Sequence, residues 1–142
     1  MAIYDLGDYP VPTFTKGRIA MSGDAAHATS PHHGAGAGFC LEDSAVLSTL
    51  LTDERVHSLK SLRAALAAYD SCRRERSQWL VQSSRFMGDC FELRAPGVGN
   101  VLKKIEAETT QRIGIVSNVD IQKMCEEAKE VLGKTLLAEE LR

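Results

Sequence analysis

The stretch GDAAHATSPHHGAGAGFCLED, residues 23–43, decides how this chain folds. It follows a short apolar run, and it places Gly34, Gly36 and Gly38 at alternate positions directly before a mostly apolar segment. The amides of the first turn of a helix have no acceptor within the helix, and the helix dipole adds partial positive charge there. Glycines at this point let a planar or anionic group approach those amides closely. We therefore expect a strand, a bare turn and a helix that together form a binding site.

The residues on either side of this stretch predict the nearest elements. Residues Arg18–Ser22 predict a strand that ends at the turn, and residues 36–51 predict a helix with most of its circumference buried. Ala2–Asp5 could form another strand. Pro10 and Pro12 favour an extended connector between the two, because proline fixes the backbone and restricts the residue before it.

The rest of the chain predicts helices. A second helix begins near Ser58 and, continuous or broken, ends by Pro96. The last helix has a clean apolar stripe, and Gly133 is its predicted stop. Ser117 with Asp120 resembles a capping box at the start of this helix.

This inventory predicts a mostly α-helical chain with one or two N-terminal strands. A lone strand cannot satisfy its own backbone hydrogen-bonding groups, and the chain supplies few partner strands. We therefore expect the sequence to be the carboxy-terminal part of something larger.

Composition excludes several classes of partner. The 142 residues suffice for one domain, and 17 basic against 19 acidic residues give a net charge of −2. This charge argues against nucleic-acid binding and against membrane binding driven by bulk charge. The four cysteines are scattered, and neither a signal peptide nor a membrane span is visible, so we expect a reduced, cytoplasmic protein.

The two familiar phosphate-binding motifs do not fit the glycine-rich turn. A GxGxxG fingerprint that starts at Gly34 or Gly36 meets Phe39 or Leu41 where the last glycine belongs. A Walker loop needs a lysine at its end, and this stretch contains none. Asp24 would direct a carboxylate toward the same opening, which suits hydroxyl donors better than phosphate. The pocket therefore favours a polyol chain that ends in a polar ring.

The segment GRIAMSGDAAHATSPHHGAGAGFCLEDSAVLSTLL resembles the second flavin-binding motif of FAD-dependent aromatic hydroxylases, the single-component flavoprotein monooxygenases. The closer likeness is to the salicylate hydroxylase-like branch. It covers residues 1–92 well and the final helix loosely. It implies an α/β, three-layer FAD-binding fold in the parent enzyme. Residues 1–17 would then end the substrate domain or a connector, residues 18–54 would close the FAD-binding domain, and residues 55–142 would form a helical carboxy-terminal region.

The resemblance also implies roles for individual residues. Asp24 would bind the ribityl hydroxyls of FAD, and Pro31 would lie near flavin and substrate. The backbone of residues 34–38 would face the pyrimidine edge of the flavin, where its amides stabilise negative charge at N1 and O2. Ala37 and Gly38 are the best candidates for direct amide contact. The implied cofactor-binding set is Gly23, Asp24, Pro31, Gly34, Gly36, Ala37 and Gly38.

In such enzymes NADH or NADPH reduces FAD, and O2 supplies the oxygen that hydroxylates a small aromatic acid or phenol. The family's first motif, GxGxxG, is absent from this sequence. We therefore expect the missing half, or another chain, as a partner. The alternatives are a non-catalytic interaction module that self-associates, a domain that binds flavin weakly without turnover, and a helical structural domain.

Other polar residues have simpler interpretations. His27 is interpreted as a structural histidine that holds the turn, and with His32 and His33 it makes no convincing metal site. The letters of a hydrolytic triad at Asp24, His27 and Ser30 are too crowded to align.

Glu42 and Asp43 are interpreted as contacts to the turn and the helix start, not as a catalytic pair. Trp79 and Phe86 are predicted core residues. A solvated or interface helix face is predicted for Arg73, Arg74 and Arg76.

Overall fold

The computed structural model describes residues 4–140, without the side chains of residues 139 and 140. In chain order the elements are β1 (Thr15–Lys16), β2 (Ile19–Ala20), α1 (Asp24–His27), the 3-10 turn η1 (Pro31–His33), α2 (Gly36–Leu51), α3 (Leu59–Phe91), α4 (Leu102–Ser117) and α5 (Ile121–Glu140). The prediction of a mostly helical chain with short N-terminal strands is confirmed.

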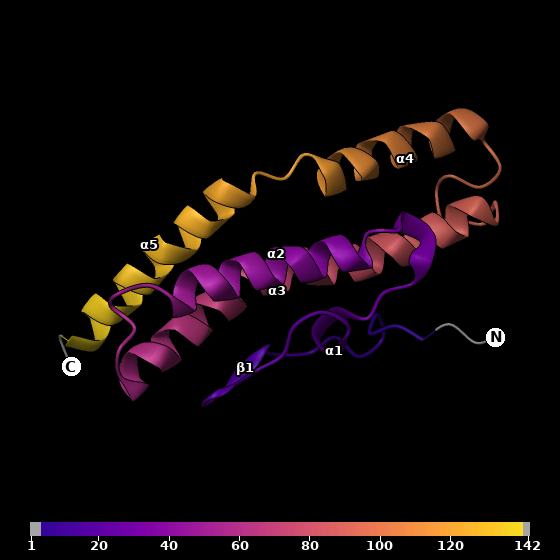
Figure 1. Cartoon of the computed structure of the whole chain (residues 1–142). Coiled ribbons are helices and arrows are strands. Elements are labelled where there is room, and N and C mark those ends of the chain that lie inside the picture. Colours follow the sequence, from indigo (N-terminus) through magenta and orange to yellow (C-terminus); the bar gives the residue numbers. More distant parts are fainter. Residues whose placement is uncertain (1–3, 141–142) are drawn as a thin grey trace.

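The helices are arranged in layers (Figure 1). Helices α2 and α3 lie side by side in the middle, and the N-terminal segment with β1 and α1 lies along one side of them. Helices α4 and α5 lie on the other side, with α5 packed against both α2 and α3. The glycine-rich turn therefore leads from the N-terminal layer into the middle layer.

The N-terminal strands form a small hairpin. Strand β2 is shorter than the predicted Arg18–Ser22, and it pairs antiparallel with β1 through Thr15 opposite Ala20 and Lys16 opposite Ile19. The described part of the chain therefore gives this strand one partner. The strand suggested at Ala2–Asp5 lies partly outside the described residues, and its described residues, Tyr4 and Asp5, form no strand.

Helix α2 begins and ends as predicted, and α3 is one continuous helix of 33 residues. The start of α3 is fixed by a capping box in which the Ser58 hydroxyl accepts from the amide of Ser61 at 3.1 Å. The helix ends at Phe91, before Pro96, and Leu93 adopts a left-handed conformation with φ of 60°.

Two predictions about the last helix are wrong. Ser117 ends α4, and the cap of α5 is Asp120 alone, whose carboxylate accepts from the amide of Lys123 at 2.9 Å. Gly133 lies inside α5 and does not end it. A Cβ at Gly133 would lie 3.0 Å from Nη1 of Arg55, the end of a flexible and exposed side chain.

The main core lies between the layers. Phe14 from the N-terminal segment, Val46 from α2 and Tyr69 from α3 are fully buried together, and Leu132 joins them from α5. The Tyr69 hydroxyl donates to the carbonyl of Met21 at 2.9 Å and ties the segment before the turn to α3.

The two aromatic residues predicted for the core lie at its margin. Phe86 is partly buried against a second, smaller cluster of Cys90, Ala95 and Val98. Trp79 is also partly buried, and it stacks on His33 with ring centroids 6.3 Å apart. Among the described residues no helix is both long and apolar enough to cross a membrane.

Candidate functional site

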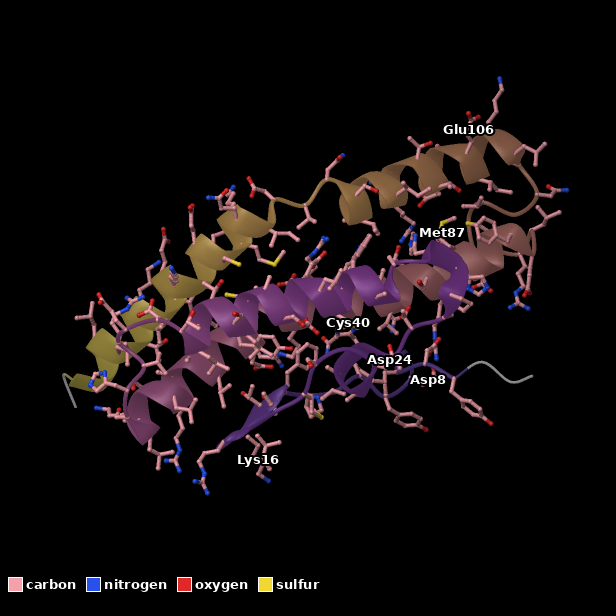
Figure 2. The ribbon with its side chains drawn as sticks, in the orientation of Figure 1. Asp8, Lys16, Asp24, Cys40, Met87 and Glu106 are labelled. Atoms are coloured by element: carbon pink, nitrogen blue, oxygen red, sulfur yellow. The ribbon has the colours of Figure 1, made fainter. Side chains whose placement is uncertain are left out.

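The site begins at Gly23, where the chain turns from the hairpin into α1. Gly23 has φ of 60°, and a Cβ there would lie 2.9 Å from the sulfur of Cys40. Backbone conformation and packing against α2 therefore both require glycine. The turn places Asp24 as the first, exposed residue of α1, and Figure 2 shows it next to the part of α2 that carries Cys40.

This contact packs Gly23, the residue before Asp24, against Cys40 of α2. Cys40 faces Gly23, and residues three and four positions earlier on a helix share its face. Those residues are Ala37 and Gly36, one helical turn away. That Asp24 and the glycine-rich turn belong to one site stays a prediction. Burial, followed by the charges of Asp24 and Asp43, raises the pKa of the Cys40 thiol.

The turn η1 connects α1 to α2. Pro31 is exposed at its first position, and the amide of Gly34 donates to the Pro31 carbonyl at 2.9 Å. Gly34 has φ of 63°, and a Cβ there would meet no atom within 4 Å. Gly34 is thus required by the backbone, not by packing.

The first turn of α2 forms a bare, electropositive surface. Its N-cap is Ala35, which makes no side-chain cap, and the first helical bond runs from the amide of Phe39 to the Ala35 carbonyl at 3.1 Å. Within residues 4–140 no acceptor binds the amides of Gly36, Ala37 and Gly38, and the turn carries no acidic residue. These three N–H groups can therefore stabilise negative charge on a bound group.

Neither glycine of this first turn is required by the protein itself. Gly36 and Gly38 do not belong to the residues with positive φ. A Cβ at Gly38 would meet nothing within 4 Å, and a Cβ at Gly36 would make only an ordinary contact of 3.6 Å with Thr29. Glycine costs a helix about 0.5–1 kcal/mol relative to alanine. The two positions keep open a surface that nothing within the described chain occupies.

A buried charge network lies directly behind this surface. Asp43, fully buried on α2, accepts through Oδ2 from the Gly23 amide at 2.9 Å and from His27 Nε2 at 2.7 Å. Its Oδ1 accepts from Nε of Arg73 at 2.8 Å. Burial alone would raise the pKa of Asp43, but the hydrogen bonds from His27, Gly23 and Arg73 outweigh it and hold the pKa below its usual value.

The network continues through Glu42. Its Oε2 accepts from Arg73 Nη1 at 2.6 Å, and its two oxygens accept from Nε and Nη2 of Arg76, both at 2.9 Å. The prediction left a solvated or an interface helix face open for the arginines. Arg73 is fully buried and Arg76 is largely buried, both against α2, so for these two the solvated alternative is wrong and the interface alternative fits. No local pattern indicated this burial, because the partner carboxylates lie 30 and 31 positions from Arg73 along the chain.

The histidines have separate partners. His27 binds Asp43, His32 Nδ1 lies 3.0 Å from the Ser30 hydroxyl, and His33 Nε2 lies 2.9 Å from the Ser83 hydroxyl. His27 thus holds the turn, as predicted. Burial, followed by the charge of Arg112, lowers the pKa of His33. Across the residues that the structure describes, no His, Cys, Asp or Glu side chains gather in a group that could hold a metal ion.

Known proteins resemble this chain in fold and in sequence. The fold resembles a solved structure titled "Salicylate hydroxylase substrate complex", with a TM-score of 0.79 and 39% identity over 84% of this chain and 29% of that one. A dual trans-enoyl reductase/FAD-dependent monooxygenase, tazHJ, of Aspergillus terreus is 42% identical over 95% of this chain and 21% of its own length. The FAD-dependent monooxygenase pigN of Monascus ruber is 44% identical over 91% of this chain and 31% of its own.

Fold and relatives define an FAD-binding domain that is similar to parts of FAD-dependent monooxygenases. The family model described as "FAD binding domain" matches residues 1–84, and the chain belongs to this family, whose cofactor is FAD. The resemblance inferred from the glycine-rich motif is therefore confirmed. The chain spans 21% and 31% of the lengths of these two relatives.

Proposed function

We propose that this chain binds the flavin end of FAD between Asp24 and the first turn of α2. The observation that carries the proposal is the pair of glycines, Gly36 and Gly38, that neither backbone angle nor packing requires. A planar ring edge can approach their amides within hydrogen-bonding distance, whereas a methyl group on either residue would stand in the way. FAD, the cofactor of the family, is a group that fits this surface.

The residues have distinct tasks in this proposal. The exposed carboxylate of Asp24 accepts hydrogen bonds from the ribityl hydroxyls. An ionised phosphate group has no such donors. The free amides of residues 36–38 donate to the N1–O2 edge of the ring and stabilise negative charge there. Gly23 shapes the turn into α1, and Gly34 shapes the connection from η1 to α2. When bound, FAD supplies the redox chemistry with O2 that the protein side chains cannot perform.

The proposed reaction is the hydroxylation of a small aromatic acid or phenol, with NADH or NADPH as reductant. The likeness to the salicylate hydroxylase structure supports this class of substrate. Pro31 is exposed at the start of η1, between the Asp24 segment and the bare amides, and we assign it to the border of flavin and substrate. A bare, exposed proline edge offers substrate an apolar surface without competing hydrogen bonds.

The proposed partner is the part of the family fold that carries GxGxxG, on the same or another chain. Exposed apolar side chains support it, since Ile19 on β2 is 70% exposed and Leu41 on α2 is 69% exposed. Self-association through the same residues remains a prediction, and so does a cytoplasmic location. Sedimentation velocity tests self-association: a concentration-independent monomer would contradict it. The interaction-module alternative gains no support from the relatives, which are named as monooxygenases.

Flavin titration with a matched pair of variants tests the proposed function. Asp24→Asn removes the ribityl partner, and Glu106→Gln removes a charge from an exposed carboxylate on α4, in the layer beyond α2 and α3 (Figure 2). We expect Asp24→Asn to weaken FAD binding about tenfold, as loss of a charged hydrogen bond does, and Glu106→Gln to leave it unchanged. Equal affinity of the two variants would refute the role of Asp24.

A further inference from the structure

The buried network behind the glycine-rich turn points to a residue that orients the site without touching the cofactor. We propose that Asp43 is a positioning residue, which fixes both ends of α1 and thereby sets the direction of Asp24. The inference rests on the proposed function of Asp24 and deepens it.

The first step is the geometry at Oδ2 of Asp43. This single oxygen accepts from the amide of Gly23, the residue before α1, and from the ring of His27, the last residue of α1. Helix α1 has only four residues, so two anchors at its ends determine its orientation. Asp24 lies between them, and its carboxylate direction follows from theirs.

The second step is the orientation of Asp43 itself. Arg73 donates from Nε to its Oδ1, and the same guanidinium donates from Nη1 to Glu42. Glu42 is held in turn by Arg76 through two bonds. Since all these side chains except Arg76 are at least 96% buried, the carboxylate has one satisfied orientation.

The third step separates this role from bulk stability. Buried ion pairs contribute little net stability compared with apolar residues of similar size, but removing one partner is costly. Asp43 of α2 instead connects three other parts of the chain: Gly23 before α1, His27 at the end of α1, and Arg73 of α3. Because these bonds share one carboxylate, they fix the position of α1 relative to α2 and α3.

Asp43→Asn is the test variant, and Glu42→Gln is its matched control. An asparagine has one acceptor oxygen, which the permanently charged Arg73 takes, so its NH2 faces the donors of Gly23 and His27. The anchor of α1 is then lost. Glu42→Gln removes the same charge from the adjacent residue of the same network, but its remaining amide oxygen can still accept from Arg73, whose Nε keeps its own bond to Asp43. Glu42 also has no bond to Gly23 or His27.

Hydrogen exchange of the 15N-labelled chain gives the first readout, without any flavin. The Gly23 amide should exchange at least about tenfold more slowly than the amides of Asp24 and Ala25, for which the described residues offer no acceptor. Asp43→Asn should abolish this difference, and Glu42→Gln should keep it. A wild-type Gly23 amide that exchanges as fast as its neighbours would overturn the proposal, even if Asp43→Asn does not fold.

Flavin analogues give the second readout. Riboflavin carries the ribityl chain that Asp24 would bind, whereas lumiflavin has the same ring without it. Asp43→Asn should weaken riboflavin binding about tenfold and leave lumiflavin binding within about twofold, because only the Asp24 contact is misdirected. Equal losses for both ligands would show general loosening and would overturn the positioning role. If the wild-type chain binds neither ligand, the proposed flavin site fails, and hydrogen exchange alone decides the role of Asp43.

Discussion

Replacing Gly38 by alanine separates the needs of the fold from those of the ligand. Gly38 is the third residue of α2, its φ is not positive, and the added Cβ would meet no atom within 4 Å. Alanine in a helix is favoured over glycine by about 0.5–1 kcal/mol, so the variant should be more stable by about 0.5 kcal/mol near the helix end. A gain of this size should raise the Tm by about 1–3 °C.

The same methyl group should harm flavin binding. It projects from the turn whose amides are proposed to meet the ring, and loss of one such hydrogen bond costs about 1–1.5 kcal/mol, or about tenfold in Kd. Gly114→Ala in α4 is the control, because its Cβ would meet only Asn118 Nδ2, at 3.8 Å. That variant should gain similar stability and keep its affinity.

The assay pairs thermal unfolding, followed by circular dichroism, with quenching of flavin fluorescence. If the Gly38→Ala variant is more stable than the wild type and binds flavin as tightly, the reasoning is refuted, because flavin binding would then not require glycine at this position. A loss of more than about 1 kcal/mol in stability would also contradict it, because glycine would be needed by the fold.

Other predictions follow from the same contacts. Gly23→Ala should destabilise the chain by about 2 kcal/mol or more, measured by urea unfolding, because position 23 combines a positive φ with a 2.9 Å approach of the added Cβ to Cys40. Gly34→Ala should cost only about 1 kcal/mol, because position 34 has a positive φ but no close contact. A similar cost for both would contradict the packing described at Gly23. Since the pKa of Asp43 is lower in the folded chain than in the unfolded one, its contribution to stability is present above about pH 4 and lost as the pH falls through the folded pKa. Acid unfolding of Asp43→Asn should therefore be less steep in that range than acid unfolding of the wild type, and identical curves would count against the network. Because burial and nearby carboxylates raise the pKa of Cys40, iodoacetamide should label its thiol at pH 8 more slowly than it labels the amino acid cysteine in solution. Mass spectrometry measures the labelling rate, and faster labelling of Cys40 would contradict the prediction.

Local patterns determined how much of the fold could be predicted. The limits of α2 follow from the glycines before it and its apolar length, so they agree with the structure. The sequence did not show whether α3 is one helix or two. Its middle contains no glycine or proline that would mark a break, and because it is polar it has no apolar pattern that would show continuity. The prediction at Gly133 was wrong because a glycine can either end a helix or lie within one, and the local sequence does not distinguish the two.

The site shows the same division. The sequence indicated which residues form the turn, but it gave one explanation to glycines that the structure separates into two kinds. Gly23 and Gly34 have positive φ, whereas neither backbone angle nor packing requires glycine at positions 36 and 38. The burial of Arg73 was not foreseen, because its partner carboxylates lie 30 and 31 positions away along the chain. Long-range pairing of this kind has no periodic signal in a single sequence.

The most direct test of the central claim is an NMR titration of the 15N-labelled chain with FAD. This method detects even weak binding at individual amides. We predict that the amides of Gly36, Ala37 and Gly38 shift together with that of Asp24, in a saturable manner. Shifts confined to other parts of the chain, or none at millimolar FAD, would contradict a flavin site at the start of α2.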